Sequence, residues 1–305
     1  NGNTGGSTPA SQSVATGSPI NVQSNSGSLV RTGYTFLGWY SNSLGTGGTP
    51  YTPGVTSVTP SGNTTLYANW SATSFPVDFD SNTATTGTMS SQTFTAGTGQ
   101  VLSANTFAKT GYTFSNWNTA ANGSGSTYAD LANLTLYATT TFYALWSANS
   151  FPVTFDSNTA TSGSMSNLTY TAGSAQALSA NAFSKTGFTF AGWATTSSSS
   201  VVFSDLQSIT LYETTTVYAK WTGNNLIVKF YPNSGAGTMS DQTIVAGTGT
   251  AITTSTFTYS GNSFTGWNTV AGGTGTSYND AEIVTIITDM DLYAQWSSTP
   301  TFSVT

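Results

Sequence analysis

The feature that most constrains this chain is an internal repeat marked by tryptophan. The eight tryptophans fall into two series. One series closes the stretches GYTFLGW, GYTFSNW, GFTFAGW and GNSFTGW, at Trp39, Trp117, Trp193 and Trp267. The other closes TTLYANW, TTFYALW, TTVYAKW and MDLYAQW, at Trp70, Trp146, Trp221 and Trp296. Neighbours in the second series are 76, 75 and 75 residues apart, so the sequence predicts four tandem copies of one unit.

Alternating apolar residues predict that each unit consists mainly of strands. The second unit opens with SFPVDFD at 74–80, where Phe75, Val77 and Phe79 share one face. Pro76 lacks an N–H group, which indicates an edge strand or an amide that faces outward.

Two further stretches of the second unit carry weaker patterns. Residues 100–111 do not alternate, so we expect one or two short helical turns there. In the strand that ends at Trp117, simple alternation predicts Phe114 on one face and Trp117 on the other. Apolar residues on both faces of the closing strand indicate a central strand, or one covered by the short helix.

The unit boundaries follow from the repeat. We predict repeat 1 at 1–71, lacking its opening strand, repeat 2 at 72–147, repeat 3 at 148–222, repeat 4 at 223–297 and a further strand at 298–305. The linkers SATS, SANS and TGNN are short, so adjacent units are expected to touch or nearly touch. The expected architecture is therefore a stiff linear array of mostly β modules with little helix.

Composition excludes several classes of function. Charged residues make up 5% of the chain, against roughly 25% in an ordinary soluble protein. There is no Cys and no His, which excludes disulfides, thiol chemistry and histidine-based metal or acid–base sites. The few basic residues form no patch for nucleic acid. No apolar run approaches the ~20 residues of a membrane span.

The repeated motifs also carry a family resemblance. The combination K-T-G-[YF]-T-F-x-G-W, a glycine-rich loop and L-Y-A-x-W resembles the Listeria–Bacteroides repeat family, which includes the B-repeat of internalins. The resemblance implies a β-grasp-like α+β module in secreted or surface-anchored bacterial proteins, usually in stalks or adhesin segments. It implies no catalytic residues and no cofactor. Repeat 4 departs from the pattern with YSGNSF in place of KTGYTF.

The four units are offset by one strand. Aligning Gln12 with Gln92 places Asn1 opposite Ser81, so the first repeat lacks the counterpart of SFPVDFD. The stretch TFSVT at 301–305 resembles that opening strand, and Thr305 matches Asp78. Three explanations fit: one molecule donates this strand to the next, the sequence is a window of a longer repeat protein, or it is a trimmed fragment.

Strand donation is the leading hypothesis because an open sheet edge is a template for pairing. A contact between the tail of one copy and the head of another would produce an open filament. The predicted donor strand consists of Thr301, Phe302, Ser303, Val304 and Thr305. The predicted acceptor residues of repeat 1 are Val14, Ile20, Val22, Tyr34, Phe36, Trp39, Leu66, Tyr67 and Trp70.

Chemical motifs are weak by comparison. Carboxylate pairs occur at Asp78/Asp80, Asp280/Glu282 and Asp289/Asp291, but none recurs in all four units. They are best explained as solvated strand ends, with a calcium site at the last pair as the alternative. The recurring aromatic residues are best explained as core, with stacking on sugars as the alternative.

The sequence therefore predicts a structural protein without catalysis, outside the cell or on its surface. The favoured form is the subunit of a bacterial filament or fibre that assembles head to tail with itself. The alternative is a stalk or glycan-binding segment of a longer adhesin, and an enzyme ranks third.

Overall fold

The computed structural model describes residues 2–298, and every regular element in that range is a β-strand. The chain divides into two compact units, Asn1–Asn149 and Ser150–Thr305. The α+β form of the module that we expected is wrong: between 100 and 111 the chain forms part of β8 (Gly99–Val101) and then continues as irregular extended chain. The fold class over the described range is all-β.

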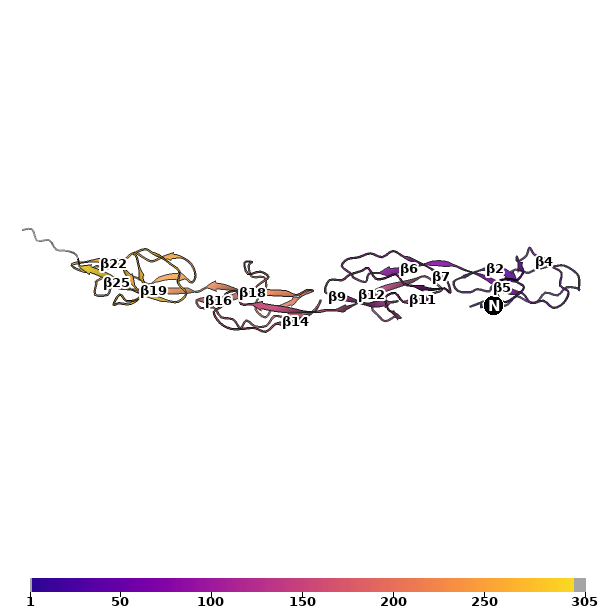
Figure 1. Ribbon diagram of the computed structural model, residues 1–305, viewed down its shortest axis with the longest axis horizontal. Coiled ribbons are helices and arrows are strands. Elements are labelled where there is room, and N and C mark those ends of the chain that lie inside the picture. The colour runs from indigo at the N-terminus through magenta and orange to yellow at the C-terminus, as the bar shows by residue number, and fades with distance from the viewer. Residues whose placement is uncertain (1, 299–305) are drawn as a thin grey trace, which may run out of the picture. The chain divides into compact units, whose positions relative to one another are not determined.

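The second repeat contains the complete sheet, with strand order β10-β9-β12-β6-β7. Figure 1 labels four of these strands, β6, β7, β9 and β12. Its two central strands, β6 (Ser74–Asp80) and β12 (Thr140–Ala148), run parallel, and the other pairs are antiparallel. The flanking strands are β7 (Gln92–Thr95), β9 (Tyr112–Asn118) and β10 (Thr127–Tyr128). A separate two-stranded ribbon pairs β8 with β11 (Asn133–Thr135).

Repeats 3 and 4 have the same topology, except that the sheet of repeat 3 has no counterpart of β10. Repeat 3 consists of β13 (Ser150–Asp156), β14 (Leu168–Thr171), β15 (Ala175–Ala177), β16 (Phe188–Ala194), β17 (Ser208–Thr210) and β18 (Thr215–Gly223). Repeat 4 consists of β19 (Asn225–Tyr231), β20 (Gln242–Val245), β21 (Thr250–Ala251), β22 (Asn262–Asn268), β23 (Ser277–Tyr278), β24 (Ile283–Val284) and β25 (Met290–Ser298).

Pro76 lies in an interior strand, so the edge position that we considered is wrong. β6 pairs with β7 over Ser74–Val77 and with β12 only from Val77 onward. Pro76 therefore pairs on one side, opposite Thr93, and its missing N–H group interrupts no bond to the parallel neighbour.

A β-bulge reverses the predicted faces of the tryptophan strand. The pairing of β9 with β12 slips at Leu145/Trp146, and equivalent slips occur in the other three repeats. The extra residue returns Trp117 to the face of Phe114, and their ring centroids lie 5.1 Å apart. Simple alternation gave the wrong face because a bulge shifts the period by one residue.

Tryptophan lies at the centre of each complete core. Trp117, Trp193 and Trp267 are each 0% exposed. Edge-on or tilted aromatic contacts surround them, such as Phe79 on Trp117 at 5.0 Å and Phe230 on Trp267 at 5.0 Å. Each core thus depends on an aromatic residue from the opening strand.

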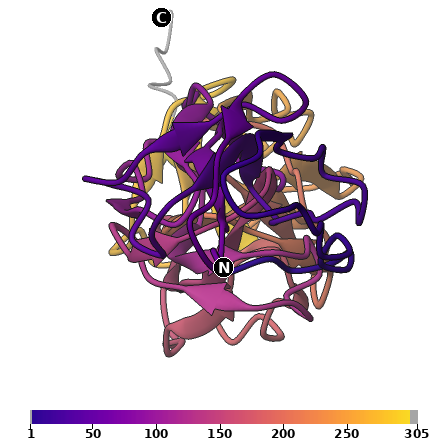
Figure 2. The ribbon, with the colours of Figure 1, turned by 90° about the vertical axis from the view of Figure 1, so that its right-hand side faces the viewer.

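In the part of the chain that the structure describes, the first repeat has five strands, against seven in the second, and its long indigo loops face the viewer in Figure 2. Its sheet has the order β3-β2-β5, formed by β3 (Pro50–Tyr51), β2 (Tyr34–Tyr40) and β5 (Tyr67–Ala72). A ribbon pairs β1 (Ile20–Asn21) with β4 (Ser57–Val58). The core cluster has four buried residues in the described range: Val22, Leu29, Trp39 and Ala68.

Neighbouring repeats within each unit are joined by the same backbone hydrogen bonds. In the first unit the Thr73 N–H donates to Gly33 O at 2.9 Å, and the Ala96 N–H donates to Thr73 O at 3.0 Å. In the second unit the Asn224 N–H donates to Gly187 O at 2.9 Å, and the Ala246 N–H donates to Asn224 O, also at 2.9 Å. The last strand of one repeat therefore continues directly into the opening strand of the next.

Candidate strand-acceptor site

In a complete repeat the opening strand fills the gap between two other strands. Val77 of β6 lies opposite Thr140 of β12 on one side and opposite Gln92 of β7 on the other. Phe75 pairs with Phe94, and Phe79 pairs with Phe142. The opening strand thus covers the core and supplies ladder bonds to both neighbours.

The corresponding position in the first repeat has no strand in it among residues 2–298. There β5 lies at the edge of its sheet. Residues 64–66, the counterparts of 140–142, are not in strand conformation, and neither are residues 12–15, the counterparts of 92–95. An edge that pairs in three repeats is therefore open in this one.

The open position changes the exposure of the residues that line it. Val14 is 37% exposed, whereas its counterpart Phe94 is 0% exposed. Leu66 is half-buried, whereas Phe142 is 0% exposed. Trp39 has 8% of its surface exposed and so keeps most of its burial. We call the position between residues 12–15 and residues 64–66, the counterparts of the segments on either side of β6, the open slot.

Local hydrogen bonds support the alignment that defines this slot. The Gln23 N–H donates to Gln12 Oε1 at 3.3 Å, as the Ser103 N–H donates to Gln92 Oε1 at 2.9 Å. The Thr4 N–H donates to Val30 O at 2.7 Å, as the Thr85 N–H donates to Ala108 O at 2.8 Å, so the match before Gln12 is offset by one residue from the alignment expected from the sequence. Repeat 1 therefore follows the common fold from the residues that come just after the opening strand.

The structure brings together only some of the predicted acceptor residues. Trp39 and Leu66 lie in the core cluster of repeat 1, as their counterparts Trp117 and Phe142 do in repeat 2, whereas Val14, the counterpart of Phe94, is exposed and lies outside that cluster. Val22 is buried behind them. Phe36 and Trp70 pack edge to face at 5.4 Å within the same core.

Three predicted acceptor residues lie elsewhere. Tyr34 lies at the junction with repeat 2, under the guanidinium of Arg31 at 3.8 Å. Tyr67 alternates with Leu66 and Ala68, so it faces away from the core. Ile20 pairs with Val58 in the small ribbon. The predicted donor, Thr301–Thr305, lies outside the described residues.

Sequence reasoning missed three residues of the slot. Ala68 is 4% exposed and corresponds to Ala144, which is 0% exposed beside Trp117 in the core of repeat 2. Gln12 and Thr64 correspond to the two residues that flank Val77. The alignment of Gln12 with Gln92 could have identified Gln12 and Thr64. Their counterparts in repeat 2, Gln92 and Thr140, are the first residues of the two strands next to the opening strand.

The slot is electrically neutral, and its chemistry is that of apolar side chains and peptide groups. At the equivalent of Val14, repeat 3 has Tyr170, which is 1% exposed. Its hydroxyl has no hydrogen-bond partner within the described range, and burial raises the pKa of this phenol above its ordinary value. Such a site suits a strand with alternating apolar residues and offers no charged group for catalysis.

The carboxylates that we considered for chemistry accept hydrogen bonds from the protein itself. Asp280 accepts from the Ser255 N–H at 3.0 Å and from Trp267 Nε1–H at 3.4 Å. Asp289 accepts from the Ile227 N–H at 2.8 Å. Asp80 accepts from the Asn82 N–H at 2.7 Å. Over residues 2–298 no group of three acidic side chains is placed to hold a metal ion.

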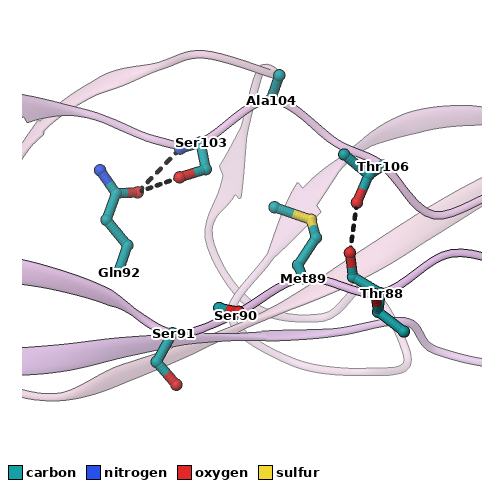
Figure 3. Close-up of a pocket in the computed structure, with 8 residues that line it drawn as sticks. All are labelled: Thr88, Met89, Ser90, Ser91, Gln92, Ser103, Ala104 and Thr106. Carbon is teal, nitrogen blue, oxygen red and sulfur yellow. Dashed lines mark hydrogen bonds between the residues drawn. The ribbon is translucent and has the colours of Figure 1, made fainter.

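Repeat 2 also carries a shallow hollow of about 410 Å³ (Figure 3). Met89 projects into it, between the segment that holds Thr88 and the segment that holds Ser103. Gln92 Oε1 accepts from the Ser103 N–H and hydroxyl, and the Thr106 hydroxyl donates to Thr88 O. Its lining is neutral, and the polar groups of Gln92 and Ser103, and of Thr88 and Thr106, bond to each other.

The fold and this slot define a class of protein: a tandem array of all-β modules in which each opening strand completes a sheet. The Listeria-Bacteroides repeat domain matches residues 1–69, 75–145, 151–220 and 227–295, so the chain belongs to that family, as its motifs predicted. Four tandem repeats are thereby confirmed.

Two relatives come from the bacterium Evansella cellulosilytica. One, named as a Gly-rich membrane protein, is 31% identical over 95% of this chain and 33% of its own length. The other, named as a membrane protein, is 26% identical over 87% of this chain and 39% of its own length. The chain thus spans little more than a third of the curated relatives that it matches. Within residues 2–298 the structure contains no helix that could cross a membrane.

Proposed function

We propose that this chain is a non-catalytic structural subunit of a bacterial fibre or filament on the outer side of the cell. The proposal rests on the open slot of repeat 1, which matches a strand that the other three repeats supply for themselves. The family and the relatives named as membrane proteins support a cell-surface location.

In this proposal the donor is the segment 301–305 of another copy. Aligned on SFPVDFD, Phe302 takes the place of Phe75 and Val304 that of Val77. Phe302 then lies opposite Val14, and Val304 lies between Gln12 and Thr64. Each side chain enters a position where the complete repeats hold an apolar residue.

The energy of this contact is modest. Burial of Phe302 and Val304 contributes roughly 1.5–3 kcal/mol each. Ladder hydrogen bonds add about 1 kcal/mol each. Association costs about 4–15 kcal/mol, so five residues alone give a marginal complex, and contacts between the flanking repeats have to contribute.

Disulfide trapping tests the proposal directly, because the chain contains no cysteine. Ser13 and Ser303 correspond to Thr93 and Pro76, which lie directly opposite each other in repeat 2. Cα atoms of such a pair are about 4.5–5.5 Å apart, within the range that a disulfide spans. The full chain with Ser13→Cys and Ser303→Cys should form a ladder of covalent oligomers on a non-reducing gel after mild oxidation.

The matched control is Val14→Cys with Ser303→Cys, in which the two thiols lie on opposite faces of the sheet and should not pair. Equal ladders from both pairs, or none from either at concentrations up to about the millimolar range, would show that strand donation is wrong. This concentration range would detect complexes whose binding free energy is as weak as about −4 kcal/mol.

The second candidate function is a stalk or glycan-binding segment of a longer adhesin. The chain's limited share of its relatives' length favours it. The stacked pair Tyr231 and Tyr293, 4.8 Å apart, is an aromatic cluster that repeats 2 and 3 lack, because Asp80 and Asp156 stand at the first position. A monomeric double-cysteine variant would favour this candidate over the filament.

A further inference from the structure

Within each unit, neighbouring repeats meet through the same corner and socket. The corner is a glycine followed by an aromatic residue: Gly33 and Tyr34 in the first unit, Gly187 and Phe188 in the second. A Cβ on Gly33 would collide with Ala96 and with the carbonyl of Tyr137. The corner glycine is therefore needed for close approach of the two repeats.

The socket is equally regular. It consists of a buried alanine, a left-handed glycine and a large apolar residue. In the first unit these are Ala96, Gly97 at φ 73° and Tyr137. A Cβ on Gly97 would meet the Tyr34 hydroxyl and the Tyr137 ring.

The second unit repeats the arrangement with Ala246, Gly247 at φ 75° and Ile287. There a Cβ on Gly247 would meet the ring of Phe188. Corner and socket thus make an apolar contact in both units.

Repeat 1 has a socket of the same backbone shape but different chemistry. Gly17 has φ 76°, and its N–H group donates to Pro60 O as the Gly97 N–H donates to Leu136 O. Thr16 stands where the other repeats have alanine, and Ser61 stands where they have Tyr137, Tyr212 or Ile287. Thr16 and Ser61 are exposed, and no atom lies within 4 Å of a Cβ built on Gly17.

Repeat 4 has a corner in which a polar residue likewise replaces an aromatic one. Gly261, at φ 71°, precedes Asn262, where the other repeats have Tyr34, Tyr112 or Phe188. Asn262 is half-buried, and its side-chain amide donates to Ser260 O at 3.1 Å. A Cβ built on Gly261 also has no atom within 4 Å.

We propose that these two polar faces are the matched halves of the contact between copies. This inference rests on the proposed head-to-tail assembly, because a strand that enters the open slot brings the corner of repeat 4 onto the socket of repeat 1. Asn262 then meets Thr16 and Ser61 through hydrogen bonds and bridging water. Inside the chain, the equivalent contact is made by an aromatic residue against an alanine and a glycine.

The proposed contacts along the fibre therefore differ in strength. The two junctions described inside the chain bury apolar surface, whereas the junction between copies exchanges hydrogen bonds with water for hydrogen bonds across the contact, which stabilises it by less than apolar burial would. The fibre therefore opens between subunits before the junction within either unit separates, which makes assembly reversible.

The test converts the polar faces to the internal type in the full chain. The triple variant Thr16→Ala, Ser61→Tyr and Asn262→Tyr should form oligomers that dissociate about tenfold more slowly after dilution, because added apolar contact acts mainly on the dissociation rate. Oligomer size is followed by light scattering. The control variant, Ser198→Tyr with Ser200→Tyr, adds two tyrosines to an exposed loop of repeat 3 and should dissociate as the unmodified chain does.

Each result has a separate meaning. Slower dissociation of the triple variant alone supports the inference. Assembly of both variants with unchanged dissociation overturns it and leaves the filament proposal standing. Loss of assembly in the triple variant also overturns it, since the polar contact would then be the stronger one. If the unmodified chain never assembles and the double-cysteine ladder is absent, the filament proposal fails and this inference fails with it.

Discussion

Repeats 1 and 2 share one unit of the molecule and nearly the same framework, yet among residues 2–298 an opening strand is seen in repeat 2 and not in repeat 1. Both have a tryptophan strand with a bulge, a closing strand and a small two-stranded ribbon. The core cluster of repeat 2 has seven buried residues, and that of repeat 1 has four over the described range. The difference identifies the opening strand as the element that covers the core.

The comparison also shows what the framework does without that strand. Trp39 is 8% exposed, and its Nε1–H group donates to Gln23 O at 3.0 Å. In repeat 2 the same group of Trp117 donates to Asp130 Oδ1 at 3.3 Å. The central tryptophan thus finds a hydrogen-bond acceptor in either repeat, whereas the neighbouring position holds a buried Phe94 in one and an exposed Val14 in the other.

The largest expected effect comes from replacing Phe94 and its counterpart Val14 by alanine, each in a separate variant. Phe94→Ala should destabilise repeat 2 by about 3–5 kcal/mol, because it leaves a cavity beside a fully buried core. Val14→Ala should cost about 0.5 kcal/mol or less in the unassembled chain, since Val14 is 37% exposed and lies outside the core cluster of repeat 1. Hydrogen exchange resolved by peptide reports the protection of each repeat separately.

Repeating the measurement on trapped Ser13→Cys, Ser303→Cys oligomers sharpens the comparison. If a donated strand covers Val14, Val14→Ala should become costly there while the effect of Phe94→Ala stays the same. An equal, small effect of Val14→Ala in both states would mean that the slot stays open in the oligomer.

Much of this architecture was predictable from periodic residues. The tryptophan spacing gave the number of repeats, and alternation gave the inward face of Phe75, Val77 and Phe79, of which Val77 is 0% exposed. The family resemblance, based on two motifs at a fixed separation, is confirmed. These features depend on residues close together in the sequence, so they can be predicted from one sequence alone.

The errors have physical causes that the pattern hides. The bulge before Trp117 adds one residue to β9 that has no partner opposite it in β12. The alternation of apolar residues within β9 does not reveal this extra residue. The expected helical turns are absent from the described chain because 99–101 pairs with 133–135, a contact distant in sequence. Tyr34 was predicted as an acceptor residue, but it lies at the junction between repeats, next to Gly97.

The second expected effect concerns two glycines with almost the same backbone. Gly17 has φ 76° and Gly97 has φ 73°, so alanine costs about 1–2 kcal/mol of backbone strain at either position. At Gly97 the new methyl group also displaces the Tyr34 hydroxyl, which adds about 1 kcal/mol.

Comparing Gly97→Ala with Gly17→Ala in thermal unfolding therefore isolates the contact between repeats. The double variant Gly97→Ala with Tyr34→Phe serves as its control, since removing the hydroxyl should restore most of the added cost. A larger loss at Gly17 than at Gly97 would contradict the assignment of Gly97 to a packed socket.

The smallest expected effect concerns the cations that precede each corner. Lys109 lies over Tyr112 at 4.5 Å and donates to the Thr83 hydroxyl at 2.7 Å, just after the opening strand of repeat 2. Arg31 lies over Tyr34 at 3.8 Å, and its guanidinium lies beside Gly2, the counterpart of Thr83, which offers no side-chain acceptor. Lys109→Met and Arg31→Met should each cost about 0.5–1 kcal/mol through the lost cation–π contact. Only Lys109→Met should also increase hydrogen exchange over residues 81–84, since it alone releases the chain that leaves the opening strand; equal exchange there in both variants would mean that this lysine does not hold the strand end in place.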